Sequence, residues 1–365
     1  MINIEYKKAF LKFIFSLKKF RRKSKKNQFQ SILLTAVSSI FIIGLCFSLP
    51  STVEFLKKPE VVENLSKKQL DRVLSGENLI TEDNEQNLDQ RYLYEDIEFD
   101  DGPSKSVRIK ASVLKQLFED EDYELKYVRS NKTVKPFDVG MLPSEMKKIE
   151  DTKKRKDLFI KIVLPLILEE NDRIKIDRKK LFKILNKNMN SDSEKKWLNS
   201  KFKQYGVLNK DLSTLKVRMD IVPVSLAIAQ AAKETGWGTS RFAIEGNALF
   251  GQWTWSGEGI KPAGVDSKDA KHKVMKFKVL KASVRAYQRN LNTHGSYKKF
   301  RSERANMRDN DEELDSLLLA DYLDKYAATG KEYTKILKQI IKQNNLKDFD
   351  KVKLLPTSLQ LKSII

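Results

Sequence analysis

Cysteine and histidine are nearly absent from this chain of 365 residues, which has one cysteine, Cys46, and two histidines, His272 and His294. A single cysteine cannot form an intrachain disulfide. A zinc site usually needs two or three His or Cys ligands, so the sequence argues against a zinc amidase or a zinc endopeptidase. No Gly-x-Ser-x-Gly motif, Walker loop or dinucleotide-binding fingerprint is present either. We therefore predict neither a metal nor another cofactor.

Charge is missing from the stretch between Asn27 and Val53. Within it, residues 29–50 are apolar enough, and numerous enough, to cross a bilayer as one helix. Residues 1–28 hold ten Lys or Arg and one acid, which favours a cytoplasmic N-terminus. A cleaved signal peptide is the alternative, although the apolar run is longer than a usual signal core. The pattern predicts a single-pass anchor in the cytoplasmic membrane, with the rest of the chain in the periplasm or the cell-wall space.

Basic charge beyond this segment is interleaved with acids, although the net charge of the whole chain is +21. Such mixed runs are usually solvated helix faces. Nucleic-acid binding would need a basic stripe together with a reading motif, and neither is visible in the sequence. A positive exterior suits the anionic cell wall and lipid surface. We therefore predict no nucleic-acid partner.

Composition divides the remaining chain into three parts. Residues 51–134 are predicted to form a polar stalk and juxtamembrane region. Within it, residues 51–100 are rich in charge, Asn, Asp and Gln and are expected to have little packed structure, whereas residues 105–130 alternate weakly, which favours a small strand–helix unit. Residues 135–350 are dominated by helical periodicity, and residues 351–365 form a C-terminal tail. Between Gly246 and Phe277 the chain is rich in Gly and holds Trp253 and Trp255, which fits a small β-rich lobe or a long loop.

Helical periodicity over most of this region predicts a mainly α fold. The predicted helices cover residues 158–171, with an interruption or kink at Pro165, and then 174–185, 194–205, 223–235, 283–293, 312–326 and 333–344. Gly330 separates the last two. No internal repeat is evident.

The segment AQAAKETGWG, residues 229–238, is the most informative part of the chain, because a helix of small apolar residues ends there in Glu234 and then in glycine. Pro223 suits the first position of this helix. Glu234 follows Ala227 by seven positions and Ala231 by three, so it points off the same apolar face. Partial burial and the negative end of the helix dipole both raise its pKa, as a general acid at neutral pH requires. On these residues alone, a surface glutamate in the last turn of a core helix is an equal alternative.

Two further motifs follow this helix. Trp237 stands between two glycines, and residues 246–251 read Gly-Asn-Ala-Leu-Phe-Gly. The pairing of a helix-end Glu-x-Gly-Trp-Gly with Gly-Asn-x-Leu-Phe-Gly resembles the glucosaminidase family, glycoside hydrolase family 73, which cuts the glycan strands of peptidoglycan. Segments 220–227 and 289–294 resemble its Bax-like branch, and the resemblance covers roughly residues 135–345. It implies a lysozyme-like fold, with a helical body, a small β lobe and a glycan cleft between them.

The resemblance also implies a catalytic pair. Glu234 would be the general acid that protonates the leaving oxygen, and Tyr333 matches a tyrosine that the family places close to the acid. Residues 330–332 are Gly-Lys-Glu where many relatives have an Asp-Pro-type turn, so this loop differs from the family pattern. Core packing on the last helix is the alternative role for Tyr333, and packing is the role that we predict for Tyr326 and Tyr287.

Glycosidic cleavage usually needs a second carboxylate besides the acid. The family places a possible second acid in the β lobe, where the candidates are Glu258, Asp266 and Asp269. A solvated loop residue is the alternative reading for each of them. If none of them acts, the N-acetyl group of the substrate could assist the reaction instead.

Aromatic side chains near these motifs are candidates for substrate binding, because the apolar C–H faces of sugar rings stack on aromatic faces. Together with the turn residue of the second motif, the set comprises Trp237, Asn247, Phe250, Trp253 and Trp255. Core packing is the alternative for Trp237 and Phe250. Asn247 could instead fix its turn through a side-chain hydrogen bond.

The sequence as a whole predicts a membrane-anchored β-N-acetylglucosaminidase whose domain, residues 135–350, acts on the glycan strands of peptidoglycan. One alternative is a lytic transglycosylase, which shares the fold and the single acid but closes the sugar into an anhydro product. The other is a non-catalytic wall-binding scaffold that keeps the cleft. The oligomeric state is left open.

Overall fold

The computed structural model describes residues 97, 107–254, 259–260 and 273–356, all within one structural unit, residues 68–365. The membrane anchor predicted at residues 29–50 lies outside the described residues. In the part of the chain that is described, no helix is both long enough and apolar enough to span a bilayer.

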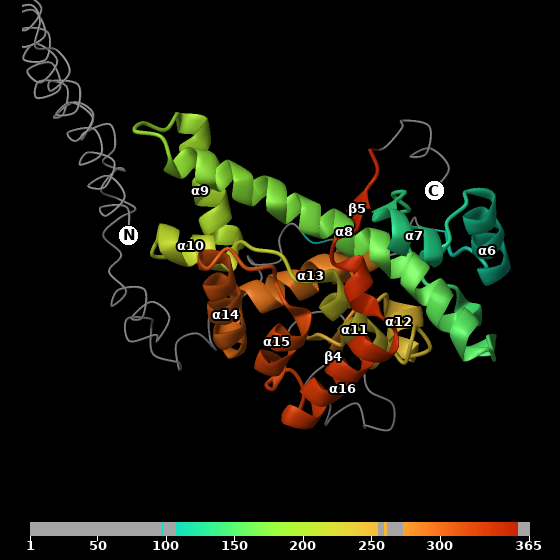
Figure 1. Cartoon of the computed structure of the whole chain (residues 1–365). Coiled ribbons are helices and arrows are strands. Elements are labelled where there is room, and N and C mark those ends of the chain that lie inside the picture. Colours follow the sequence, from blue (N-terminus) through green and yellow to red (C-terminus); the bar gives the residue numbers. More distant parts are fainter. Residues whose placement is uncertain (1–96, 98–106, 255–258, 261–272, 357–365) are drawn as a thin grey trace, which may run out of the picture. The chain divides into compact units, whose positions relative to one another are not determined.

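The described elements are mainly helical, as predicted (Figure 1). The α-helices are α6 (Ala111–Asp120), α7 (Leu125–Asn131), α8 (Thr152–Leu185), α9 (Asp192–Gln204), α10 (Leu212–Arg218), α11 (Val224–Thr235), α12 (Arg241–Gly246), α13 (Leu280–Thr293), α14 (Lys298–Asp309), α15 (Ser316–Ala320) and α16 (Lys331–Gln343). Short 3-10 helices are η2 (Ser144–Lys148), η3 (Gly295–Tyr297), η4 (Asp321–Leu323) and η5 (Leu346–Phe349).

Two small sheets complete the described fold. Strands β1 (Thr133–Val134) and β5 (Lys353–Leu354) pair in parallel. Strands β2 (Trp253–Thr254), β4 (Lys273–Met275) and β3 (Gly259–Ile260) form an antiparallel sheet in the order β2-β4-β3. The β-rich lobe predicted between Gly246 and Phe277 therefore contains a three-stranded sheet.

Helix α8 is one continuous helix, where the sequence predicts separate helices at 158–171 and 174–185. Pro165 has no N–H to donate to the carbonyl of Lys161, four residues earlier. The hydroxyl of Tyr123 donates to that carbonyl instead, at 3.0 Å. Because the orphaned acceptor is satisfied and the middle of the helix is fully buried, packing carries the helix through the proline.

Two other segments also differ from the sequence prediction. The strand–helix unit predicted at 105–130 is instead the two helices α6 and α7, which place Leu114, Phe118 and Val128 in the same hydrophobic core as α8 and α11. The packed domain therefore begins before residue 135. The helix predicted at 312–326 is reduced to α15 and the 3-10 helix η4.

Helix α11 is the central element of the site, and it packs against α8 and α16. Its residues from Val224 to Ala232 are all buried. Pro223 is the N-cap of this helix and not its first helical residue as predicted, with φ −52° and ψ 136°. The helix ends after Thr235, because Gly236 takes a left-handed conformation with φ 57° that glycine adopts without strain. The predicted helix end beside Glu234 is thus confirmed.

The loop that leads into α11 is held by a buried carboxylate, Asp220, which is 2% exposed. Arg308 binds both carboxylate oxygens, at 3.1 and 3.3 Å, and Arg178 lies 3.7 Å away. The buried Arg304 donates to the backbone carbonyl of Asp220 at 3.1 Å. Burial alone would raise the pKa of Asp220, but the charges of the three arginines outweigh it and lower the pKa.

Replacing Asp220 with asparagine is expected to destabilise the domain by about 3 kcal/mol near neutral pH, because it leaves buried guanidinium groups without their counter-charge. A lowered folded-state pKa means that the stabilisation is present above the ordinary Asp value and is lost as the pH falls through the folded value. Thermal unfolding of wild type and D220N at a series of pH values measures this difference. The control is D309N, since Asp309 makes an exposed pair with Lys216 at 3.5 Å. Equal losses in the two variants would contradict the expectation.

Candidate active site

Glu234 lies at the C-terminal end of α11 with its side chain half-buried. Its Oε1 accepts a hydrogen bond from the hydroxyl of Tyr333 at 2.9 Å. Its Oε2 lies against Gly251, where a Cβ atom would come within 3.2 Å of that oxygen. Burial raises the pKa of Glu234, and the opposing effects of the Tyr333 hydrogen bond and the Lys233 charge are smaller. The predicted direction of the pKa shift is therefore confirmed, with burial as its main cause.

Tyr333 is the third residue of α16 and is 2% exposed. Its hydroxyl donates to Glu234 and accepts from the Nε2 of Gln230 at 3.1 Å. Burial raises the pKa of Tyr333 far above its ordinary value, so the hydroxyl keeps its proton and remains a donor. Its ring stacks on Tyr326, with centroids 5.5 Å apart and planes 8° apart. Tyr333 thus both packs in the core and contacts the carboxyl, and the structure brings the two predicted residues together.

Gln230 and Tyr287 complete a buried network that the sequence prediction missed. Both side chains are 0% exposed, and the Tyr287 hydroxyl donates to Oε1 of Gln230 at 2.6 Å. Gln230 precedes Glu234 by four residues, so α11 presents both side chains on one face. A sequence signal was available, because a glutamine within an apolar helix must find hydrogen-bond partners when it is buried.

The Gly-Asn-Ala-Leu-Phe-Gly motif, residues 246–251, packs against the hydrogen-bonded network of Gln230, Tyr287 and Tyr333 through Phe250. The Phe250 ring is 1% exposed and stacks on Tyr287, with centroids 3.8 Å apart and planes 7° apart. The hydroxyl of Tyr326 donates to the carbonyl of Phe250 at 2.8 Å. Phe250 is therefore placed for core packing and not for contact with a sugar, because its ring is covered. The motif supports the wall of the site on the side of Gly251.

Asn247 fixes the turn at the start of the same motif. It is 4% exposed, with a left-handed φ of 51°, a conformation that asparagine tolerates better than most residues. Its Nδ2 donates to the carbonyls of Phe277 and Lys278 at 2.9 and 3.0 Å. These bonds tie the motif to the segment before α13. The position therefore fits the turn-fixing alternative, because the side chain is buried and its amide nitrogen is bonded within the fold.

Trp237 is half-buried and follows Glu234 by three residues. One edge contact joins its ring to Phe159, at a centroid distance of 5.9 Å. The ammonium group of Lys156 lies 4.8 Å from the ring centroid. Trp237 therefore remains a candidate for sugar stacking close to the acid.

The remaining candidates belong to the β lobe. The carboxylates Glu258, Asp266 and Asp269 and the ring of Trp255 lie outside the described residues. The backbone of Trp253 pairs with Val274 in the β2–β4 ladder.

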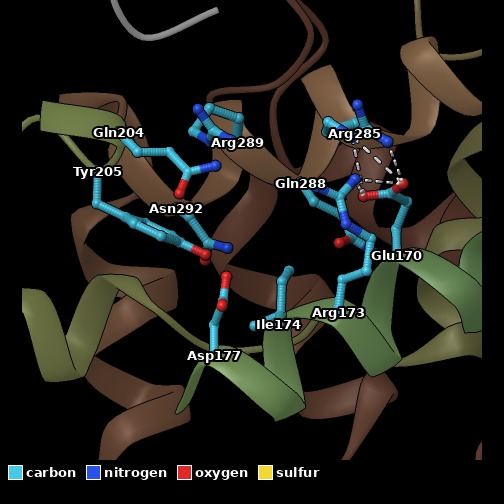
Figure 2. Close-up of a pocket in the computed structure, with 10 residues that line it drawn as sticks. All are labelled: Glu170, Arg173, Ile174, Asp177, Gln204, Tyr205, Arg285, Gln288, Arg289 and Asn292. Carbon is cyan, nitrogen blue, oxygen red and sulfur yellow. Dashed lines mark hydrogen bonds and ion pairs between the residues drawn. The ribbon is translucent and has the colours of Figure 1, made fainter. Parts of the chain in front are cut away.

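A polar cavity that does not include Glu234 lies between α8, the end of α9 and α13 (Figure 2). Arg173 and Arg285 converge on its buried Glu170, with ion-pair distances of 3.1 and 2.9 Å. Its other carboxylate, Asp177, pairs with Lys201 at 2.5 Å. Both carboxylates are therefore held in ion pairs within the fold. Among the described residues, no group of three or more His, Cys, Asp or Glu could hold a metal ion.

Comparisons with known proteins bear on the segment that holds this network. Residues 210–346 match the glucosaminidase family model, described as mannosyl-glycoprotein endo-beta-N-acetylglucosaminidase. The chain is 32% identical over 206 residues to the protein Bax of Escherichia coli (strain K12), covering 55% of this chain and 73% of that protein. The catalytic domain of the autolysin Auto from Listeria monocytogenes is 21% identical. That match covers 50% of this chain and 97% of that one, with a TM-score of 0.28.

Proposed function

We propose a function from the premise that this chain belongs to the Bax-like glucosaminidase family. The proposed function is hydrolysis of the glycan strands of peptidoglycan after N-acetylglucosamine. One observation carries the proposal: a half-buried carboxyl at the end of α11, Glu234, has a raised pKa and a tyrosine hydroxyl on one of its oxygens. A carboxylic acid with a raised pKa keeps its proton to higher pH than an ordinary glutamate, and in that form it can protonate a glycosidic oxygen.

In the proposed reaction, Glu234 donates its proton to the leaving oxygen as the C–O bond breaks through an oxocarbenium-like transition state. Tyr333 stabilises the carboxylate that remains, since its hydroxyl already donates to Oε1. Water is then added to the sugar with help from a second group. The candidates for that group are Glu258, Asp266, Asp269 and the N-acetyl group of the substrate.

A digest of purified peptidoglycan with the full-length chain tests this function. The products are reduced with borohydride and measured by mass spectrometry. Reduced N-acetylglucosamine ends are expected. Reduced N-acetylmuramic acid ends would indicate a muramidase, anhydro ends a lytic transglycosylase, and intact strands a non-catalytic wall-binding protein.

The proposed substrate, peptidoglycan, requires the catalytic domain to lie outside the cytoplasm. We propose that residues 29–50 anchor the chain in the cytoplasmic membrane and that the catalytic domain faces the periplasm or cell-wall space. The support is the charge-free apolar run behind the basic residues 1–28. A reporter fused after residue 60, active only when exported, is expected to be active. Activity of a cytoplasm-specific reporter at that position would overturn the placement.

A further inference from the structure

A chain of three hydrogen bonds leads from the protein interior to the carboxyl of Glu234. Tyr287 on α13 donates to Gln230 on α11, Gln230 donates to Tyr333 on α16, and Tyr333 donates to Glu234. The three donors are 0%, 0% and 2% exposed. Groups this deeply buried depend on one another for their hydrogen bonds.

The direction of the chain follows from what each group can offer. Burial raises the pKa of Tyr287 well above its ordinary value, so its hydroxyl keeps a proton to donate. Because Tyr287 donates to the carboxamide oxygen of Gln230, the carboxamide nitrogen must face Tyr333. The Tyr333 oxygen accepts from that nitrogen, and its own proton points at Glu234. The opposite orientation of the carboxamide would leave the Tyr287 proton without an acceptor.

Resting on the proposed function, we propose that Gln230 and Tyr287 are positioning residues: together they force the Tyr333 hydroxyl to donate to Oε1 of Glu234, so that the acid carries its proton on Oε2. A proton on Oε1 would face the hydroxyl hydrogen of Tyr333, and Gln230 prevents that hydroxyl from turning away. Oε2 lies against Gly251, whose missing side chain leaves room beside the oxygen that delivers the proton.

Stacked rings on both sides keep this chain of donors in place. Phe250 stacks on Tyr287, and Tyr326 stacks on Tyr333. The charged and titratable groups that act on Glu234 are Tyr333 from α16 and Lys233 from α11. The charge of Glu234 also contributes to raising the pKa of Tyr287 and of Tyr326. Among these groups, only Tyr333 is hydrogen-bonded to the carboxyl, so the orientation of its hydroxyl is the property that Gln230 and Tyr287 can control.

The test measures the titration of Glu234 in the full-length chain, labelled with carbon-13 at the glutamate carboxyls. The Glu234 signal is the one missing from Glu234→Gln. Tyr287→Phe keeps the stacked ring but frees the Gln230 carboxamide to turn and take the Tyr333 proton. Gln230→Met removes the carboxamide at similar volume. Tyr287→Phe is expected to move the Glu234 titration to higher pH by about one pH unit, as expected for losing a hydrogen bond to a charged group. Gln230→Met, which frees the hydroxyl but offers it no competing acceptor, is expected to move the titration in the same direction by less.

Tyr333→Phe alone should give the same shift as Tyr287→Phe, and Tyr287→Phe should add nothing to it, because it acts only through the Tyr333 hydroxyl. The control is Tyr123→Phe, which removes a buried hydroxyl bonded to the carbonyl of Lys161 and should leave the titration unchanged. A Glu234 titration in Tyr287→Phe and Gln230→Met equal to that of the control would overturn the proposal. The readout does not depend on turnover, whereas intact glycan strands after digestion with the wild-type chain would overturn the proposed function alone.

Discussion

Replacing Glu234 with glutamine is expected to remove glycan cleavage and to leave the fold intact. Glutamine is nearly isosteric with the acid, and its carboxamide oxygen can still accept from the Tyr333 hydroxyl. The amide cannot act as a proton donor of the required acidity. General acid catalysis typically contributes roughly 10²–10⁴-fold to the rate, so turnover should fall at least that far while binding to peptidoglycan is retained. Release of reduced sugar ends, measured beside a melting temperature, checks both halves of the expectation.

The same residue sets the expected pH dependence of the wild-type enzyme. Because the group must be protonated to act, the rate falls as the pH rises through its pKa. Burial raises that pKa above the ordinary value of Glu, so the basic limb of the pH–rate profile should lie above about 4.3. The control is E245Q, since Glu245 is exposed and pairs with Arg241 at 3.5 Å. Wild-type cleavage by E234Q would remove Glu234 as the acid.

Patterns within short stretches of sequence account for the part of the site that could be predicted. The small apolar residues of α11 at helical spacing, ended by Gly236, place Glu234 on the last turn of a buried helix. That placement also predicts the direction of its pKa shift. The segment 246–251 was recognisable as a family motif, and two of its residues take the packing and turn-fixing roles that the sequence offered beside substrate binding. Phe250 packs and Asn247 ties the turn, because both side chains face the protein.

Hydrogen bonds between distant segments account for the part that could not be predicted. Gln230 and Tyr287 are separated by 57 residues, and Gln230 and Tyr333 by 103. Periodicity assigns a buried tyrosine to the core but does not show where its hydroxyl points. Pro165 is a similar case: the predicted break does not occur, and the carbonyl that the proline leaves without a donor accepts from the hydroxyl of Tyr123, which lies outside any local window. Tertiary partners thus decide both the continuity of α8 and the environment of the acid.

Replacing Tyr333 with phenylalanine is the second change with a large expected effect. The ring and its stacking on Tyr326 are kept, and only the hydroxyl between Gln230 and Glu234 is lost. If that hydroxyl stabilises the carboxylate left after proton transfer, kcat should fall by roughly 10²–10⁴-fold. The unpaired Nε2 of Gln230 should destabilise the fold by about 1–3 kcal/mol.

The pH profile separates this catalytic role from a loss of packing. The Tyr333 hydrogen bond lowers the pKa of Glu234, so its removal should move the basic limb of the remaining activity to higher pH. The control is Y322F, because the hydroxyl of Tyr322 is hydrogen-bonded to Glu303, outside the network. That variant should keep the wild-type profile. A Y333F enzyme with unchanged kcat and an unmoved basic limb would assign Tyr333 to packing and would leave Glu234 to work without it.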